Sequence, residues 1–225
     1  NARESAPARK RFFTPAALIP LALVLSAGTA QAADAVLMAA ITNPNAVTQT
    51  AGNVSVPLFQ NADGAAHQMS ADGRYQLFAS LAPNLVPGQD GARSVINTYL
   101  YDSLQQTVRL VSHVPGSATT GGNFHSLGAV ISAGGSRVAF VSGATDLVTG
   151  VTIANGGTGD IYLYEVATGD IRLVSHVAGN ASQGGNEASD AGGIALSADG
   201  RYVAYPSAAT NLVAGFSDAN GAGVP

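Results

Sequence analysis

The side chains best placed for chemistry are two aspartates in a phrase that occurs twice, Ser-Ala-Asp-Gly-Arg-Tyr, which contains Asp72 and Asp199. A carboxylate acts as a general acid or base only where it reaches a suitable proton, and a catalytic pair needs a second titratable group nearby. The sequence shows no second titratable residue at a spacing that would place it beside either aspartate. Aspartate in a tight turn commonly accepts backbone N–H bonds. We therefore interpret Asp72, Gly73, Asp199 and Gly200 as structural turn residues.

Other catalytic signatures are also missing from the sequence. It contains no Gly-x-Ser-x-Gly elbow, no phosphate-binding loop and no Cys-x-x-Cys pair. We predict no catalytic residue, no cofactor-binding residue and no enzyme activity within this chain.

A weak candidate metal site begins at Asp218 and Asn220, which alternate before Gly221. Oxygen ligands at alternate positions, followed by a glycine, are typical of calcium loops. One repeat earlier, Ile153 stands where the first carboxylate would be needed. This favours an ordinary turn in a surface loop over calcium, which stays the alternative, and no other cofactor is predicted.

The four histidines could in principle bind a metal. His113 and His176 occupy the same place in successive units. Equivalent strands of adjacent units diverge, so the two imidazoles should lie too far apart to share an ion at about 2 Å. His67 and His125 have no partner at ligand spacing. We expect solvated histidines on edges or loops.

Two Tyr-Leu-Tyr phrases could form a platform for sugars or bases; they contain Tyr99, Tyr101, Tyr162 and Tyr164. Tyrosines on paired strands more often pack in a core, with their hydroxyls reaching a backbone group. We predict core packing for these rings.

The elements that must position these residues come from an internal repeat. Ser70, Ser132 and Ser197 open related glycine turns at nearly even intervals along the chain. The phrases Arg-Leu-Val-Ser-His-Val and Gly-Gly-Asn each return after one and the same interval, and an Asn/Asp-Leu-Val phrase occurs three times. Whole units are therefore repeated, and the core must form where the units stack.

Within a unit, the apolar pattern predicts strands and no helix. Residues 137–142 form a short β-prone run, residues 160–166 alternate between two faces, and residues 171–175 follow a Thr-Gly turn. The segment from about 189 to 196 is expected to supply a fourth strand. Four antiparallel strands per unit predict an all-β fold, a β-propeller of four-stranded blades.

The predicted organisation has three parts. Residues 1–32 combine a basic start, an apolar stretch and a small-x-small cleavage site, as in a signal peptide. Residues 33–65 are a lead-in strand segment. The propeller repeats occupy 66–225, at approximately 66–127, 128–192 and a truncated 193–225. Two and a half to three blades do not close a ring, so we expect an incomplete fragment, with completion by other copies as the alternative.

Composition limits the partners and the compartment. The chain has 10 basic and 14 acidic residues and no cysteine. An acidic chain without a basic patch argues against nucleic acid and anionic lipid as partners, and no disulfide is available. The leader predicts a periplasmic or secreted protein with no membrane span after its removal.

The sequence also resembles a known repeat family. Ser-Ala-Asp-Gly-Arg-Tyr-Val-Ala at 197–204, Asn-Leu-Val at 211–213 and Ile-Tyr-Leu-Tyr-x-x-x-Thr-Gly at 161–169 resemble the TolB-like, WD40-like propeller repeats of exported bacterial proteins. The resemblance covers about residues 66 to 225. It implies blades in which the Ser-x-Asp-Gly turn joins the first two strands and Thr-Gly joins the last two. Gly134 replaces the aspartate in the middle unit, and residues 103–106 replace a Thr-Gly turn.

These observations predict a non-catalytic exported propeller that offers a loop-rich face to a protein or cell-envelope partner. One alternative is the propeller module of a larger hydrolase or peptidase whose catalytic domain lies outside this chain. A second alternative is an extracellular repeat protein stabilised by calcium.

Overall fold

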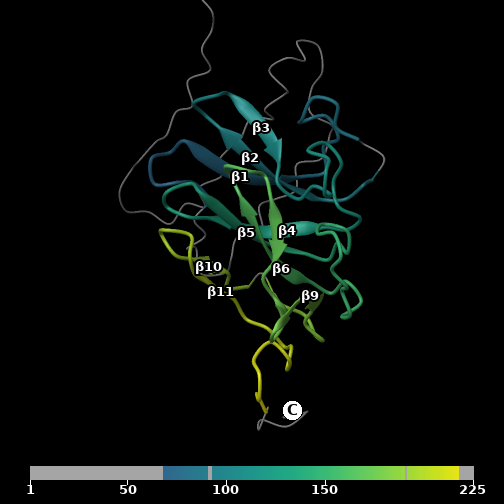
Figure 1. Ribbon diagram of the computed structural model, residues 1–225. Helices are drawn as coiled ribbons and strands as arrows, with labels where there is room; N and C mark the ends of the chain where they lie inside the picture. The colour runs from purple at the N-terminus through teal and green to yellow at the C-terminus, as the bar shows by residue number, and fades with distance from the viewer. Residues whose placement is uncertain (1–67, 91–92, 191, 218–225) are drawn as a thin grey trace, which may run out of the picture. The chain divides into compact units, whose positions relative to one another are not determined.

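A computed structural model describes residues 68–90, 93–190 and 192–217 of the chain (Figure 1). All of these residues belong to the second of the two compact units into which the chain divides, Met38–Pro225. The described part is all β and contains no helix, so no helix in it could cross a membrane. Its strands are β1 (Tyr75–Ser80), β2 (Asn97–Asp102), β3 (Thr107–Leu110), β4 (Ser126–Ile131), β5 (Arg137–Ser142), β6 (Asp160–Glu165), β7 (Ile171–Leu173), β8 (His176–Val177), β9 (Asn180–Gly184), β10 (Ala195–Leu196) and β11 (Val203–Ala204).

The strands form antiparallel sheets from neighbours in the sequence. The orders are β1-β2-β3, β4-β5-β6-β7, β8-β9 and β10-β11, and these sheets do not close into a barrel. In the four-stranded sheet the Ser132 turn joins β4 to β5, and the Thr-Gly turn joins β6 to β7. Gly128, at a φ of 60°, lies where the register of β4 shifts between Leu127 and Val130.

The prediction of a fourth strand at 189–196 following β7 is wrong. Ala195–Leu196 pairs with Val203–Ala204 across the third Ser-Ala turn, and Ser189 bridges to Ser207. The physical reason is local, because a tight turn brings the two strands it connects into register. This segment therefore opens the third unit, and β4 supplies the additional strand of the second sheet.

The core lies between stacked sheets. Leu77 and Leu100 of the first sheet pack against Phe140, Tyr162 and Tyr164 of the second. The opposite face of the second sheet, at Ile161 and Leu163, packs against residues leading into and within β10, Ile194 and Leu196. Because it is covered on both faces, β6 is buried at its first five positions, and a simple in-out alternation is lost.

The tyrosines pack in the core, as predicted. The hydroxyl of Tyr99 donates to the Ala82 carbonyl at 3.2 Å, and that of Tyr162 donates to the Ala144 carbonyl at 3.0 Å. Burial raises the pKa of both phenols. Tyr164 is also buried, whereas Tyr101 is half-buried.

Two repeated phrases that lie far apart in the sequence meet in space. The Asn123 amide donates to the Asp146 carboxylate at 2.8 Å, and the Asn123 side chain exchanges two bonds with Thr145, at 2.8 and 2.9 Å. This contact ties the segment before β4 to the loop after β5. Equivalent bonds join Asn186 to Thr210 and Asn211.

Candidate functional site

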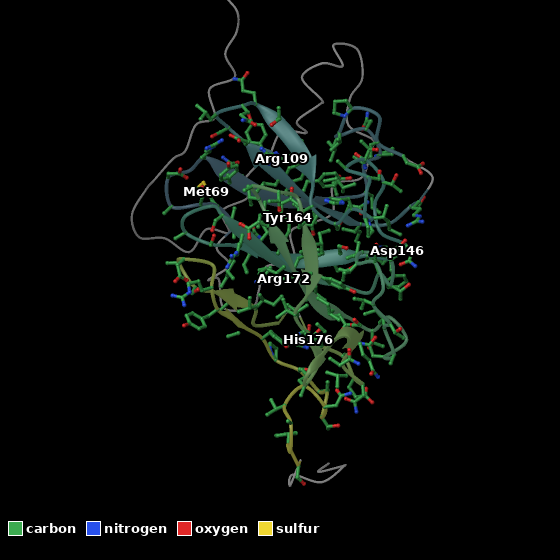
Figure 2. All side chains as sticks on the ribbon, in the orientation of Figure 1. Met69, Arg109, Asp146, Tyr164, Arg172 and His176 are labelled. Carbon is green, nitrogen blue, oxygen red and sulfur yellow. The ribbon has the colours of Figure 1, made fainter. Side chains whose placement is uncertain are left out.

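A groove with a volume of about 520 Å³ runs along β3, where the first sheet faces the β6–β7 hairpin of the second. We call it the β3 groove. Figure 2 labels Arg109 and Tyr164, which contribute to its wall. Other lining residues are Val86, His113, Ala118 and Gly169.

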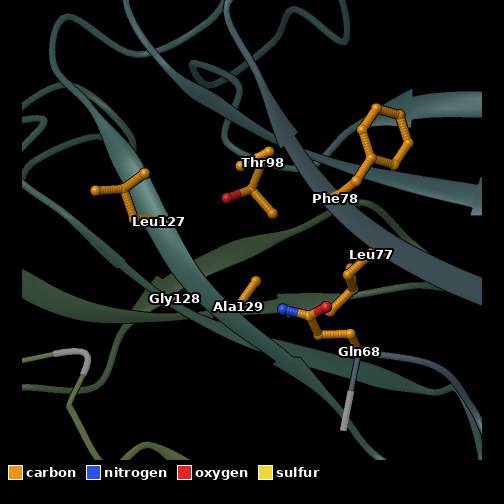
Figure 3. Close-up of a pocket in the computed structure, with 8 residues that line it drawn as sticks. Gln68, Leu77, Phe78, Thr98, Leu127, Gly128 and Ala129 are labelled. Atoms are coloured by element: carbon orange, nitrogen blue, oxygen red, sulfur yellow. The ribbon is translucent and has the colours of Figure 1, made fainter. Parts of the chain in front are cut away.

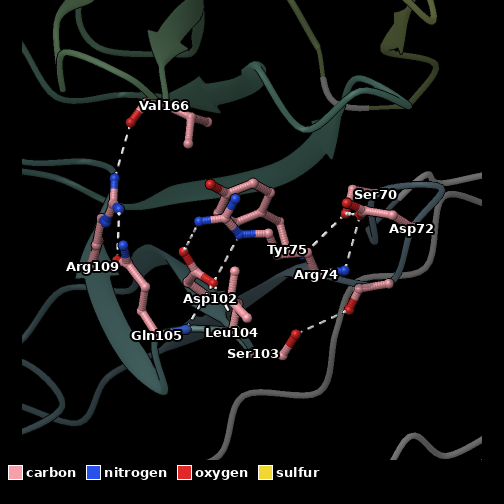
Figure 4. Close-up of polar contacts among 11 residues, drawn as sticks. Ser70, Asp72, Arg74, Tyr75, Asp102, Ser103, Leu104, Gln105, Arg109 and Val166 are labelled. Atoms are coloured by element: carbon pink, nitrogen blue, oxygen red, sulfur yellow. Dashed lines mark hydrogen bonds and ion pairs between the residues drawn. The ribbon is translucent and has the colours of Figure 1, made fainter.

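The hairpin that leads into β3 is held by a buried carboxylate. Asp102 accepts bonds from the amides of Leu104 and Gln105 at 3.0 and 3.2 Å and forms an ion pair with Arg74 at 2.8 Å (Figure 4). The Arg74 hydrogen bonds hold the pKa of Asp102 below its usual value. Gln106 in this turn takes a positive φ of 54° without being a glycine. Asp102 thus stabilises the turn between β2 and β3, which lacks the Thr-Gly phrase of the turn between β6 and β7.

Arg109 on β3 reaches the second sheet. Its Nη1 donates to the Val166 carbonyl at 2.9 Å, and its Nη2 donates to Gln105 at 3.3 Å (Figure 4). Among the described residues, no carboxylate lies within ion-pair distance of this guanidinium. The groove wall therefore carries one cation without a direct ion pair, Arg109, and it also contains the exposed Asp170 carboxylate.

His113 is not the solvated side chain that the sequence predicts. It is half-buried, its Nε2 lies 3.0 Å from the Gly169 carbonyl, and its ring packs edge-on against Tyr164. His125 also makes a hydrogen bond within the protein, because its Nδ1 accepts a hydrogen bond from the Ile96 amide at 2.9 Å. Spacing within one unit cannot reveal such contacts, since the partners belong to other strands and units. His67 lies outside the described residues.

Three residues of β3, Val108, Arg109 and Leu110, line the groove. β3 is the last strand of its sheet, and the amide of Val111, which follows it, points inward to the Thr98 carbonyl at 2.9 Å. Backbone groups alternate along an antiparallel strand, so those of Val108 and Leu110 point outward. Val108 and Leu110 are only 7% and 2% exposed, so a ligand in the groove would meet the Arg109 side chain and the β6–β7 hairpin more than this strand edge.

The predicted turn residues lie at the turns and away from the groove. Asp72 accepts from the Ser70 hydroxyl at 2.5 Å and from the Arg74 amide at 3.0 Å (Figure 4). Asp199 makes the same two bonds, with Ser197 and Arg201, at 2.6 and 3.0 Å. These bonds lower the pKa of both carboxyls. Gly73 and Gly200 have φ values of 73° and 71°, in the region that favours glycine.

The candidate calcium ligands Asp218 and Asn220 lie outside the described residues. Within the described part of the chain, no group of three or more histidine, aspartate or glutamate side chains could hold a metal. In the corresponding loop of the second unit, the Asn155 side chain donates to Asp160 at 2.9 Å, so this carboxylate is engaged inside the protein.

Asp160 is a buried carboxyl whose pKa is raised, and burial is the main cause. Ser175 donates to it at 2.7 Å. As the pH rises, the unfolded chain loses this proton near pH 4, whereas the folded protein keeps it to a higher pH. This contribution to stability is complete below that pH and is lost as the pH rises through the raised pKa.

We expect Asp160→Asn to remove this contribution. The free energy of unfolding of the variant, measured by urea titration from pH 4 to 7, should fall less steeply with pH than that of the wild type. Asn97 is the natural counterpart at this place in the first unit, where Ser112 bonds to its side-chain oxygen. The reciprocal change Asn97→Asp should make the free energy of unfolding fall more steeply with pH. Parallel curves for all three proteins would contradict the assignment of this pH dependence to a buried carboxyl.

A second, much smaller cavity lies between the first sheet and β4 (Figure 3). Its volume is about 20 Å³, and Leu77, Thr98 and Leu127 are among its lining residues. This space suffices for about one water molecule, so the cavity is too small for an organic ligand.

A scan against models of protein families finds no match to this chain, and a search of curated protein sequences finds none either. The described residues therefore define a class by architecture alone, that of all-β proteins built from stacked antiparallel sheets.

Proposed function

We propose that this chain is an exported, non-catalytic binding scaffold of the β-propeller class, related to the TolB-like repeats, and that its β3 groove binds an extended segment of a protein or cell-envelope partner. The propeller assignment is supported by the repeated hairpins and by sheets that pack face to face. The export assignment rests on the leader-like residues 1–32, which lie outside the described part.

The observation that carries the binding proposal is the combination of features along β3. The groove separates β3 from the β6–β7 hairpin, and its wall combines apolar side chains with the Arg109 cation and the Asp170 carboxylate. A concave surface lined by apolar groups with a few polar ones is the usual form of a binding site. The opposite charges favour a partner segment that places an acidic residue near Arg109 and a basic residue near Asp170.

The groove offers a direct test with a matched control. Ala118 lies in the groove wall, and Ala181 is the equivalent residue of the second unit, exposed and outside the groove. Random linear peptides displayed on phage are selected against the wild-type chain, and the affinities of the selected synthetic peptides are measured by calorimetry. Ala118→Trp should fill the groove and weaken binding at least tenfold, whereas Ala181→Trp should leave it unchanged.

Two results would overturn the proposal. One is the recovery of no binding peptide from the selection. The other is equal weakening by both tryptophan variants, because a general effect on the fold would then explain the loss.

A further inference from the structure

His113 contacts two parts of the chain through the two nitrogens of its ring. Its Nδ1 lies 2.9 Å from the Val114 carbonyl oxygen, and its Nε2 lies 3.0 Å from the Gly169 carbonyl oxygen. A carbonyl oxygen only accepts hydrogen bonds, so each ring nitrogen must donate to its partner. A neutral imidazole carries one N–H group, whereas an imidazolium carries two. The two contacts together therefore fit the protonated side chain.

The contact with Gly169 ties the first unit to the turn of the β6–β7 hairpin. Arg109 holds the other end of the same turn, because its Nη1 donates to the Val166 carbonyl at 2.9 Å (Figure 4). An arginine side chain keeps its charge throughout the pH range in which proteins are folded. Of these two side-chain bonds to the turn, only the one made by His113 can depend on pH.

The equivalent histidine of the second unit separates the local contact from the contact between units. His176, labelled in Figure 2, has its Nδ1 2.9 Å from the Val177 carbonyl oxygen. Within the described part of the chain, its Nε2 has no hydrogen-bond partner. The contact of Nδ1 with the next carbonyl is thus a property of the repeat, and the contact of Nε2 with Gly169 is the one that joins two units.

Charged groups of both signs line the groove beside His113. Arg109, on the strand that leads to His113, opposes a second proton on the ring, and Asp170 in the hairpin favours it. Tyr164 is buried and packs edge-on against the ring, with centroids 6.1 Å apart. The adjoining loop of residues 114–118 contributes no ionisable side chain. An imidazole ordinarily changes charge near about pH 6.5, where carboxyl, phenol and guanidinium groups ordinarily do not.

We propose that His113 is a pH-dependent latch between the first unit and the β6–β7 hairpin. In acid, the imidazolium donates to both carbonyl oxygens, and the hairpin is fixed to the first unit. As the pH rises, the ring loses one proton, and a nitrogen lone pair then faces a carbonyl oxygen. Because the bond to Val114 is local, the side chain keeps this bond, and the contact with Gly169 is lost.

The latch acts on the β3 groove, because Gly169 and Asp170 belong to its wall. Loss of the Gly169 contact frees the hairpin from one of its two side-chain anchors in the first unit, so this wall is held less firmly. The affinity of the groove for a ligand should therefore be higher in acid than at pH 8. This consequence rests on the proposed binding function, whereas the latch itself does not.

The pH dependence of one substitution tests the latch without a ligand. The free energy of unfolding is measured by urea titration at pH 5.5 and at pH 8 for the wild type and for His113→Gln, which keeps an amide donor and carries no charge. The stability lost by this variant should be at least twofold larger at pH 5.5 than at pH 8. Equal losses at the two pH values would overturn the latch.

His176→Gln is the matched control, because His176 occupies the same place in its unit and makes only the local contact. Its effect on the free energy of unfolding should be the same at both pH values. A pH dependence as large as that of His113→Gln would assign the effect to the local contact and overturn the latch. Asp160 is present in all three proteins, so its own pH dependence cancels in these differences.

Nuclear magnetic resonance of the wild type gives a second measurement that needs no variant. The nitrogen-15 shifts of His113 should show protons on both ring nitrogens at pH 5.5 and a proton on Nδ1 alone at pH 8. The amide signals of residues 167–170 should change with the same midpoint as the imidazole signals. A proton on Nε2 alone at pH 8, or hairpin signals that do not follow the imidazole, would overturn the proposal.

The effect on the groove is measured with those selected peptides that contain no histidine. Their affinity for the wild type should fall at least threefold between pH 5.5 and pH 8, and their affinity for His113→Gln should stay constant. An equal affinity of the wild type at both pH values would show that the latch does not control the groove. Failure to select any peptide counts against the binding function alone, because the stability and resonance measurements decide the latch without it.

Discussion

Tyr162→Ala is expected to destabilise the fold by about 3 to 5 kcal/mol, the range for removing a large aromatic side chain from a core. Tyr162 is 1% exposed, and its ring stacks on Phe140 with centroids 5.7 Å apart. It lies in the cluster that joins the first and second sheets. The loss should therefore weaken the contact between units as well as β6 itself.

The measurement is a urea unfolding curve followed by far-ultraviolet circular dichroism, because the chain has no tryptophan. Tyr162→Phe is the matched control. It keeps the stacked ring and loses only the bond to the Ala144 carbonyl, for a cost of about 1 kcal/mol. Similar midpoints for the alanine variant and the wild type would contradict the central place of this ring.

Gly122→Ala is expected to cost about 1 to 3 kcal/mol, although it adds only one methyl group. A Cβ at Gly122 would stand 2.7 Å from Leu147 Cδ2 and 2.9 Å from Ala144 Cβ. Both neighbours are buried in the cluster between the sheets, so they have little room to move. The second glycine of the Gly-Gly-Asn phrase is thus required by packing.

The same measurement applies, with Gly193→Ala as the control. A Cβ at Gly193 would meet Pro206 Cδ at 3.6 Å, an ordinary van der Waals contact. The control should unfold close to the wild type. If Gly122→Ala and Gly193→Ala have equal midpoints, close packing at Gly122 does not limit stability.

Much of the local structure follows from the sequence because it depends on short-range chemistry. The β-prone runs, the hairpin turns and the buried tyrosines are readable from alternation and turn residues. The strand at 195–196 is predicted in the wrong sheet because the pattern gives the strand and not its partner. The Ser-Ala turn at Ser197, which connects residues 195–196 to residues 203–204, is the sequence feature that identifies the correct partner strand.

The candidate site is less readable from the sequence. Arg109 and His113 belong to the first unit, and the carbonyls they contact, at Val166 and Gly169, belong to the second. Carbonyl groups have no sequence signature, so no motif points to this pairing. The shared interval at which the Gly-Gly-Asn and Arg-Leu-Val-Ser-His-Val phrases return is the signal that relates the two units.

Residue types and separations of a few positions are enough to establish an all-β repeat protein with serine and glycine turns and an acidic composition. The packed fold is needed to decide which units face each other and that Asp102 is buried under Arg74. Burial of this kind depends on which surfaces meet when the sheets stack, and neither periodicity nor composition encodes that choice.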